Sequence, residues 1–178
     1  MDIIKEGVRI LRPYECNQLI NSIPKHFHRV MFKALLYSGC RYAELQRLKN
    51  NPKWFDGNFI YLPSLKTKAR QKQRWVRLNP VGREVIATYL EQDYELPDIV
   101  GWNENLKRWS DKSVGSNGVS AKTTRKTWES WLFYYYGNRI EIYQSQGHTL
   151  QVSMEHYLNL PFLDSDKQLM KSYVDGWL

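Results

Sequence analysis

The sequence contains very little cysteine and no long apolar run. Two cysteines, Cys16 and Cys40, occur among 178 residues, and they do not form a closely spaced pair. Such a sequence excludes a disulfide framework and a cysteine-based metal site, and it favours a reducing compartment. No apolar stretch approaches the roughly 20 residues that span a bilayer, and the charged start MDIIKEGVRI lacks the apolar core of a secretory signal. We therefore expect a cytoplasmic protein with no membrane-spanning segment.

Acidic residues are also comparatively scarce. The chain has 26 lysines and arginines against 18 aspartates and glutamates, which gives a net charge of +8. An excess of this size favours a polyanionic partner, although basic proteins are common. A hydrophobic content of 42% with 14% aromatic residues excludes a disordered tail. The length fits one domain with its own apolar core.

Apolar residues recur at helical spacing along most of the chain. The segment SDKSVGSNGVS at 110–120 is rich in serine and glycine and predicts a surface loop. Gly39, Gly137 and Gly147 follow periodic segments and predict helix ends. The helices expected from this pattern cover residues 13–23, 26–38, 41–49, 80–92, 121–136 and 150–158, a short segment ending at 146, and the tail from 167. We expect the apolar stripe of this tail to pack on its own domain or on a neighbouring subunit.

One small sheet is expected beside the helices. Asp56-Gly57 separates two apolar runs, which is a strong signal for a two-residue hairpin turn. Strands at 53–55, 59–62 and 74–78 would then form a three-stranded antiparallel meander. The expected fold class is α+β, mainly helical with one small three-stranded antiparallel sheet.

Cations alternate with other residues in the segment LKTKARQKQRWVRL at 65–78. An extended strand would turn every second side chain to one face. Such a row can protect a sheet edge from mispairing, or it can contact consecutive DNA phosphates without reading bases. A turn near 69–72 must interrupt the row. Its members are Lys66, Lys68, Arg70, Lys72 and Arg74.

Three further patterns contain candidate site residues. Arg41 opens a helix just after a glycine turn. Lys122 and Arg125 are three residues apart, so they share one helix face. His148 follows Gly147, and Tyr157 comes nine residues later. Taken singly, each pattern also has an ordinary explanation, namely an exposed ion pair of Arg41 with a glutamate, a solvated helix face, and a tyrosine used for packing.

Taken in order, these patterns resemble the catalytic domain of the tyrosine recombinase (phage integrase) family. That family carries an arginine in a G-x-R-x-x-E-L context, a lysine in a β-hairpin, an H-x-x-R helix, a G-H turn and a tyrosine nine residues after that histidine. All five parts occur here in the family's order, between about residue 11 and residue 160. One position departs from the pattern, because Lys122 stands where the family most often has histidine.

The resemblance implies a role for each of these side chains. Tyr157 would be the nucleophile and would form a 3′-phosphotyrosyl bond with DNA. Arg41 and Arg125 would bind the non-bridging phosphate oxygens most strongly in the transition state. His148 would hydrogen-bond the phosphate or move the tyrosine proton.

Two lysines complete the expected site. In the family the hairpin lysine protonates the leaving 5′ oxygen, and Lys66 or Lys68 would do so here. Lys122 would donate to a phosphate oxygen, although a lysine exchanges protons near neutral pH less readily than a histidine. No metal and no cofactor is expected, because the cations would stabilise the phosphate charge themselves.

The resemblance also implies an organisation and a partner. Residues 1–178 would form a single catalytic domain, with the family's N-terminal DNA-clamping domain absent. The protein would be an integrase of a virus, plasmid or other mobile element, acting at the host nucleoid, and the Lys-x-x-Arg variant favours an archaeal element. It would bind a specific double-stranded DNA site, as a monomer in isolation and as a homotetramer on DNA. A Xer-like resolvase, a type IB topoisomerase-like enzyme and a non-catalytic basic DNA-binding module remain alternatives, and cleavage in cis or in trans stays open.

Overall fold

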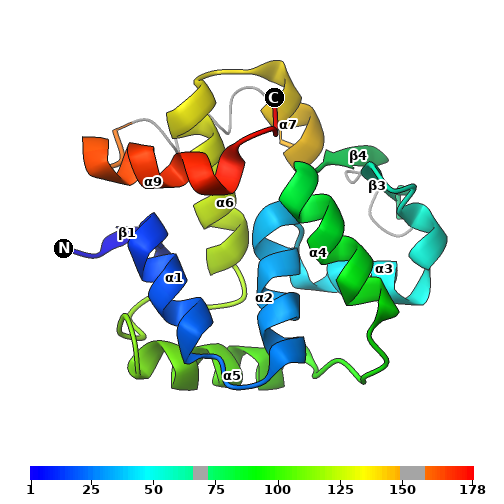
Figure 1. The fold of residues 1–178 in the computed structure, drawn as a ribbon, viewed down its shortest axis with the longest axis horizontal. Coiled ribbons are helices and arrows are strands. Elements are labelled where there is room, and N and C mark those ends of the chain that lie inside the picture. Colours follow the sequence, from blue (N-terminus) through cyan, green and yellow to red (C-terminus); the bar gives the residue numbers. More distant parts are fainter. Residues whose placement is uncertain (66–71, 149–158) are drawn as a thin grey trace.

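The computed structural model describes residues 1–65, 72–148 and 159–178, and these form a mainly helical domain with two small antiparallel sheets (Figure 1). The strands are β1 (Ile3–Lys5), β2 (Val8–Ile10), β3 (Phe59–Leu62) and β4 (Arg74–Arg77). The helices are α1 (Pro13–Ser22), α2 (His26–Ser38), α3 (Tyr42–Asn50), α4 (Pro80–Glu91), α5 (Ile99–Asp111), α6 (Thr123–Tyr136), α7 (Ile140–Gln146) and α9 (Asp164–Val174).

Helix α2 lies in the middle of the domain, where it packs against α4 and α6 (Figure 1). Its buried face includes Met31, Phe32 and Leu35, all fully inaccessible to solvent. Helix α6 contributes Trp128 and Trp131, which are equally buried. These indoles therefore belong to the core and are not available to stack on DNA bases.

The helix boundaries agree closely with the apolar periodicity. Helix α1 starts at Pro13, since a proline at the first helical position loses no intrahelical hydrogen bond. Helices α2 and α7 end at Gly39 and Gly147, both in the left-handed region that glycine adopts without a Cβ clash. The predicted helix at 150–158 lies outside the described residues.

Helix α5 is not among the helices predicted from the sequence. Trp102, Leu106 and Trp109 form its buried stripe. The carboxylate of Asp98 caps the helix by accepting a hydrogen bond from the Gly101 N–H at 2.7 Å. A glycine in the first turn and several charged residues weaken the periodic signal. The predicted loop at 110–120 therefore begins only after Asp111, where α5 ends.

The prediction of one three-stranded sheet is wrong. Strands β3 and β4 form a two-stranded sheet in the described part of the chain, and residues Pro52–Trp54 form a 3₁₀ helix in place of the first strand. Pro52 favours that helical turn, and the Asp56 carboxylate closes the next turn by accepting N–H groups of Asn58 and Phe59. Of the pairing expected between the first two strands, one isolated bridge forms, between Phe55 and Ile60.

The second sheet is an N-terminal hairpin. Strands β1 and β2 pair antiparallel around Glu6 and Gly7, whose φ angles are +52° and +76°. Two consecutive positive φ angles are typical of the tight two-residue turn that joins the strands of a hairpin. The Glu-Gly pair between short apolar runs is the sequence signal for this turn.

The C-terminal helix packs on its own domain. Met170, Tyr173, Val174 and Trp177 are buried against the rest of the chain. Leu169 stays 44% exposed. Of the two packing modes expected for the tail, the intramolecular one is therefore confirmed. No helix within the described ranges has both the length and the apolar character of a membrane span.

Candidate active site

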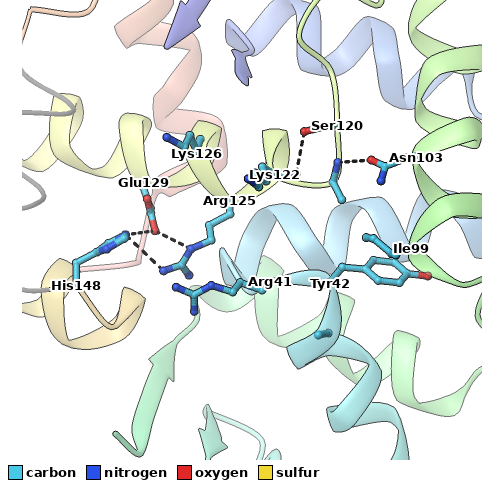
Figure 2. Close-up of a pocket in the computed structure, with 12 residues that line it drawn as sticks. Arg41, Tyr42, Ile99, Asn103, Ser120, Lys122, Arg125, Lys126, Glu129 and His148 are labelled. Atoms are coloured by element: carbon cyan, nitrogen blue, oxygen red, sulfur yellow. Dashed lines mark hydrogen bonds and ion pairs between the residues drawn. The ribbon is translucent and has the colours of Figure 1, made fainter. Parts of the chain in front are cut away.

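A cavity of about 550 Å³ brings together predicted site residues from distant parts of the chain (Figure 2). Arg41 comes from the start of α3, Lys122 and Arg125 from the start of α6, and His148 from the end of α7. Tyr42 and Ile99 lie on the side of the cavity away from His148 (Figure 2), and the apolar side chains of Ala43 and Ala121 also belong to the lining. The cavity thus has one cationic wall and one apolar wall.

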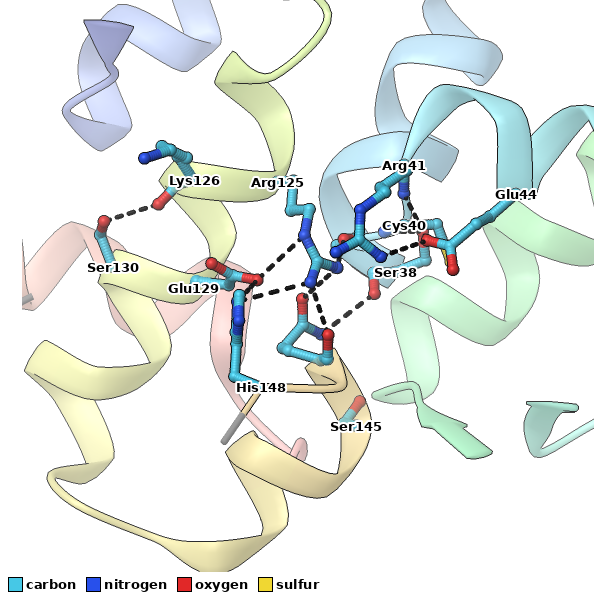
Figure 3. A network of polar contacts seen from close by, with 12 residues as sticks. Ser38, Cys40, Arg41, Glu44, Arg125, Lys126, Glu129, Ser130, Ser145 and His148 are labelled. Atoms are coloured by element: carbon cyan, nitrogen blue, oxygen red, sulfur yellow. Dashed lines mark hydrogen bonds and ion pairs between the residues drawn. The ribbon is translucent and has the colours of Figure 1, made fainter. Parts of the chain in front are cut away.

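Arg125 is the most tightly held cation of this wall, with 8% of its surface exposed. Its Nη1 donates to the carbonyl oxygen of Gly39 at 2.8 Å, and its Nη2 donates to that of Gln146 at 2.5 Å (Figure 3). Its Nε lies 3.2 Å from Glu129 Oε1. These contacts orient the guanidinium plane before any ligand binds. The solvated-face interpretation is therefore wrong for Arg125.

Gly39 is required where Arg125 meets the α2–α3 turn. Its φ of +65° favours glycine, and a Cβ built there would lie 2.2 Å from Gln146 Oε1. The Gln146 side chain in turn donates from Nε2 to the carbonyl oxygen of Ser38 at 3.3 Å. The glycine two residues before Arg41 thus lets the end of α7 approach the end of α2.

Arg41 lies at the N-terminal cap of α3. Its backbone N–H donates to Glu44 Oε1 at 2.8 Å, whereas its own Nη1 lies 3.7 Å from the same oxygen. The Arg41 side chain remains 45% exposed. Burial, and then the nearby charge of Arg125, lowers the pKa of the Arg41 guanidinium. The two arginines repel each other, so an anion bound between them would relieve that repulsion.

Glu44 makes its stronger contacts with Arg74. Both Arg74 Nη atoms donate to the Glu44 carboxylate, and Arg74 Nε donates to the Ser145 carbonyl oxygen at 3.0 Å. Burial alone would raise the pKa of Glu44, but hydrogen bonding and charge from Arg74 outweigh it and lower the pKa to about 2. This ion pair connects α3, β4 and the end of α7.

The expectation that Arg74 shares an exposed face with the other cations of its row is therefore wrong. Its side chain is 12% exposed, because β4 turns it toward the buried carboxylate of Glu44. Lys72 is exposed, as expected for a phosphate contact. Lys66, Lys68 and Arg70 lie outside the described residues.

His148 follows the left-handed Gly147, whose φ is +73°. Its backbone N–H donates to the Tyr143 carbonyl oxygen at 3.2 Å. Its imidazole Nε2 lies 2.7 Å from Glu129 Oε1 and 3.4 Å from Arg125 Nη2 (Figure 2). His148 thus reaches the cationic wall, while Tyr157 lies outside the described residues.

Lys122 and Lys126 extend the cationic wall along α6. Lys122 is exposed at the N-terminal cap of the helix and lines the cavity. Lys126 is one helix turn further and lies 3.2 Å from Glu6 Oε2 in the β1–β2 turn. Lys122 and Arg125 therefore line the same cavity, as their spacing predicts, but only Lys122 is solvated.

Two polar residues of the site are missing from the sequence prediction, Glu129 and Gln146. Glu129 is the one acidic residue of α6, and it follows Arg125 by one helix turn between two buried tryptophans. A lone carboxylate on such an apolar stretch, four residues after an arginine, is the signal that predicts its burial. Gln146 has no comparable signal, because it interacts through its main-chain carbonyl oxygen and through a side-chain hydrogen bond to Ser38, which is 108 residues earlier in the chain.

The described residues form neither a metal site nor a reactive thiol. Within residues 1–65, 72–148 and 159–178, no group of three or more histidine, cysteine, aspartate or glutamate side chains is arranged to hold a metal ion. Cys16 and Cys40 are both buried as free thiols. Burial raises their pKa values to about 12 and about 11, so neither is set up as a nucleophile.

Similarity to known proteins is found among solved structures. No protein-family model and no curated protein matches the sequence. Among solved structures, the crystal structure of XerA recombinase superimposes with a TM-score of 0.68 over 95% of this chain, at 20% sequence identity. This chain spans 64% of that protein's length. The similarity shows a shared fold and agrees, at that level, with the resemblance drawn from the motifs.

Proposed function

We propose that this chain is the catalytic domain of a site-specific tyrosine recombinase that cuts and rejoins DNA through a 3′-phosphotyrosyl intermediate. The observation that carries the proposal is the convergence of Arg41, Lys122, Arg125 and His148 on one cavity. These residues are separated by up to 107 positions in the sequence, yet they occupy the motif positions of that family. The shared fold with XerA recombinase supports the same conclusion.

In this proposal the arginines bind the phosphate to be cleaved. The Arg41 side chain is 45% exposed, so a ligand in the cavity can reach its guanidinium, whereas Arg125 is held in place by two backbone carbonyl groups. A guanidinium offers paired N–H donors that fit two phosphate oxygens. Because negative charge builds on these oxygens during attack, fixed donors stabilise the transition state more than the ground state. Lys122 adds a further donor at the edge of the cavity.

The chemical step exchanges one ester for another. The phenolic oxygen of Tyr157 forms a bond to phosphorus as the bond to the 5′ oxygen of the next nucleotide breaks. The phenol proton passes to His148, and Lys66 or Lys68 supplies a proton to the leaving 5′ oxygen. A 5′-hydroxyl from another strand reverses the same steps. The phosphotyrosyl bond retains the energy of the phosphodiester, so rejoining needs no nucleotide cofactor.

The biological role proposed is integration or excision of a mobile or viral genome at a specific double-stranded DNA site, within a homotetramer. Lys72, Lys68 and Arg70 would contact neighbouring phosphates and add affinity without sequence preference. Resolution of chromosome or plasmid dimers uses the same chemistry, as does strand relaxation of the topoisomerase IB type. Assays on DNA with two target sites and on supercoiled plasmid distinguish these three roles.

A nicked suicide DNA substrate tests the proposed chemistry. The wild-type protein should form an adduct that survives denaturation, and mass spectrometry should place the DNA on Tyr157. Tyr157→Phe should abolish the adduct, and Tyr14→Phe is the matched control, because Tyr14 is 47% exposed on α1. An adduct that persists in Tyr157→Phe would contradict the assignment. A salt-sensitive mobility shift without any adduct would identify a DNA-binding module instead.

The same assay decides between cleavage in cis and in trans. Tyr157→Phe lacks the nucleophile, and Arg41→Ala lacks a phosphate ligand but retains Tyr157. If the tyrosine acts on DNA bound by a partner subunit, mixing the two inactive proteins should restore adduct formation. If it acts within its own subunit, the mixture should stay inactive.

A further inference from the structure

Glu129 places a buried negative charge directly behind the cationic wall. It lies on α6 one helix turn after Arg125, and its side chain is 1% exposed. Its Oε1 atom lies 2.7 Å from His148 Nε2 and 3.2 Å from Arg125 Nε (Figure 3). Since a carboxylate here reduces the positive charge available to a phosphate, its presence calls for a role in the site.

The contact distances define the hydrogen bond between Glu129 and His148. An ionised carboxylate can only accept hydrogen bonds, so a contact of 2.7 Å requires a proton on His148 Nε2. The alternative, in which Nε2 accepts from Arg125 Nη2, corresponds to a longer contact of 3.4 Å. In that alternative, the unprotonated Nε2 and the Glu129 carboxylate, both hydrogen-bond acceptors, would face and repel each other. The geometry therefore favours the Nε2–H form of the ring.

Arg125 does not depend on Glu129 for its position. Its two Nη atoms already donate to the carbonyl oxygens of Gly39 and Gln146, on two other structural elements. His148, by contrast, follows a glycine in the sequence. Within the described parts of the chain, its imidazole contacts Glu129 and Arg125. The carboxylate is thus the group that orients His148.

We propose that Glu129 is a positioning residue of the reaction, which holds His148 with Nε2 protonated and leaves Nδ1 as the nitrogen that exchanges a proton with the attacking tyrosine. This inference rests on the proposed function. In a neutral imidazole one nitrogen donates and the other accepts, so fixing a proton on Nε2 makes Nδ1 the base. The phenol proton moves to Nδ1 as the phenolic oxygen bonds to phosphorus, and the carboxylate stabilises the resulting imidazolium. The proton returns to the phenolic oxygen when the strand is rejoined.

Glu129→Gln tests this role with almost no change of shape. A neutral amide can donate to or accept from Nε2, so it neither fixes the tautomer nor stabilises an imidazolium. The rate of adduct formation in a single turnover should fall roughly 100-fold or more, since a comparable carboxylate-to-amide change behind a catalytic histidine has a larger effect still. DNA affinity should be unchanged or higher. Glu141→Gln on α7 is the matched control, because its carboxylate belongs to a pair with Arg139 at the surface.

A spectroscopic measurement separates this role from a structural one. The ¹⁵N chemical shifts of isotope-labelled histidine report which ring nitrogen carries the proton. The His148 resonances are those that disappear from the spectrum of His148→Gln, which distinguishes them from the resonances of the other three of the four histidines. Spectra should be taken about two pH units above the ordinary histidine pKa. Wild-type protein should show His148 as the Nε2–H form, and Glu129→Gln should show a mixture.

The proposal requires both the tautomer change and the loss of rate, and either one alone overturns it. A Glu129→Gln protein that keeps the wild-type rate and tautomer would leave the proposed function intact and refute the role of Glu129. If wild-type protein forms no adduct at all, the proposed function fails, and the spectra still decide whether Glu129 sets the tautomer. Thermal unfolding of both variants shows whether a lost rate reflects lost folding.

Discussion

Replacement of Glu44 by glutamine should change how stability depends on pH. The Glu44 carboxylate is paired with Arg74 and also caps α3 through the Arg41 N–H. Its pKa is lowered from 4.5 to about 2 in the folded protein. One pKa unit corresponds to 1.36 kcal/mol, so the ionised carboxylate contributes about 3 kcal/mol to stability at neutral pH.

The sign of the effect follows from the lowered pKa. The contribution is fully present above pH 4.5, and it is lost as the pH falls toward 2, because the unfolded chain takes up the proton first. By the same linkage relation, about 2 kcal/mol should already be lost at pH 3. The glutamine variant cannot lose this contribution with pH, so its stability should fall by about 2 kcal/mol less than that of the wild type between pH 7 and pH 3.

Urea unfolding at pH 7 and pH 3 measures this difference. At pH 7 Glu44→Gln should be less stable than the wild type by about 3 kcal/mol, since Arg74 keeps a buried charge without its partner. Glu104→Gln is the control, because Glu104 is exposed on α5, and it should follow the wild type. If Glu44→Gln shows the same pH dependence as the wild type, the assigned ion pair does not carry the acid sensitivity, and the reasoning is refuted.

Three further predictions concern the remaining parts of the site. Gly39→Ala should lower the free energy of unfolding by more than the roughly 1–2 kcal/mol of left-handed backbone strain, since its Cβ also meets Gln146; Gly7→Ala, with a φ of +76° and open space around it, isolates the strain in urea unfolding. Arg125→Lys should slow adduct formation in a single turnover by roughly 100-fold or more while DNA affinity changes little, because one ammonium cannot make the contacts of the guanidinium with Gly39, Gln146 and Glu129. A normal rate would contradict the assigned role. Both cysteines should resist a thiol reagent at pH 8 until denaturant is added, since burial raises their pKa values; fast labelling of the folded protein would contradict this.

Most of the helical architecture is predictable from the sequence because each helix buries a regular apolar stripe. The stripe of α2 and its glycine end define that helix almost to the residue. Helix α5 escapes prediction because Gly101 and several polar residues dilute a stripe formed by tryptophans. The expected first strand at 53–55 fails to form for a local reason, since Pro52 starts a 3₁₀ turn where its pairing would begin.

The site was predictable only in part, since spacing gives residue identities but not burial. Motif order identifies Arg41, Arg125 and His148 as candidates, and the structure brings them to one cavity. Alternation along a strand cannot show that Arg74 turns inward, because the cause is a carboxylate 30 residues earlier in the chain. Glu129 likewise becomes significant only when His148 approaches it from another element.

The hydrogen-bond acceptors that hold Arg125 have a consequence for tolerance to mutation. Two of them are main-chain oxygens, at Gly39 and Gln146, and every amino acid supplies such an oxygen. No substitution can delete these acceptors, so the guanidinium is insulated from many chemical changes around it. It is correspondingly sensitive to movement, because a sideways slip of about 1 Å between the two helix ends would lengthen both bonds beyond a useful range. Mutations that alter backbone path, rather than those that alter side-chain chemistry, should therefore be the ones that disable this arginine.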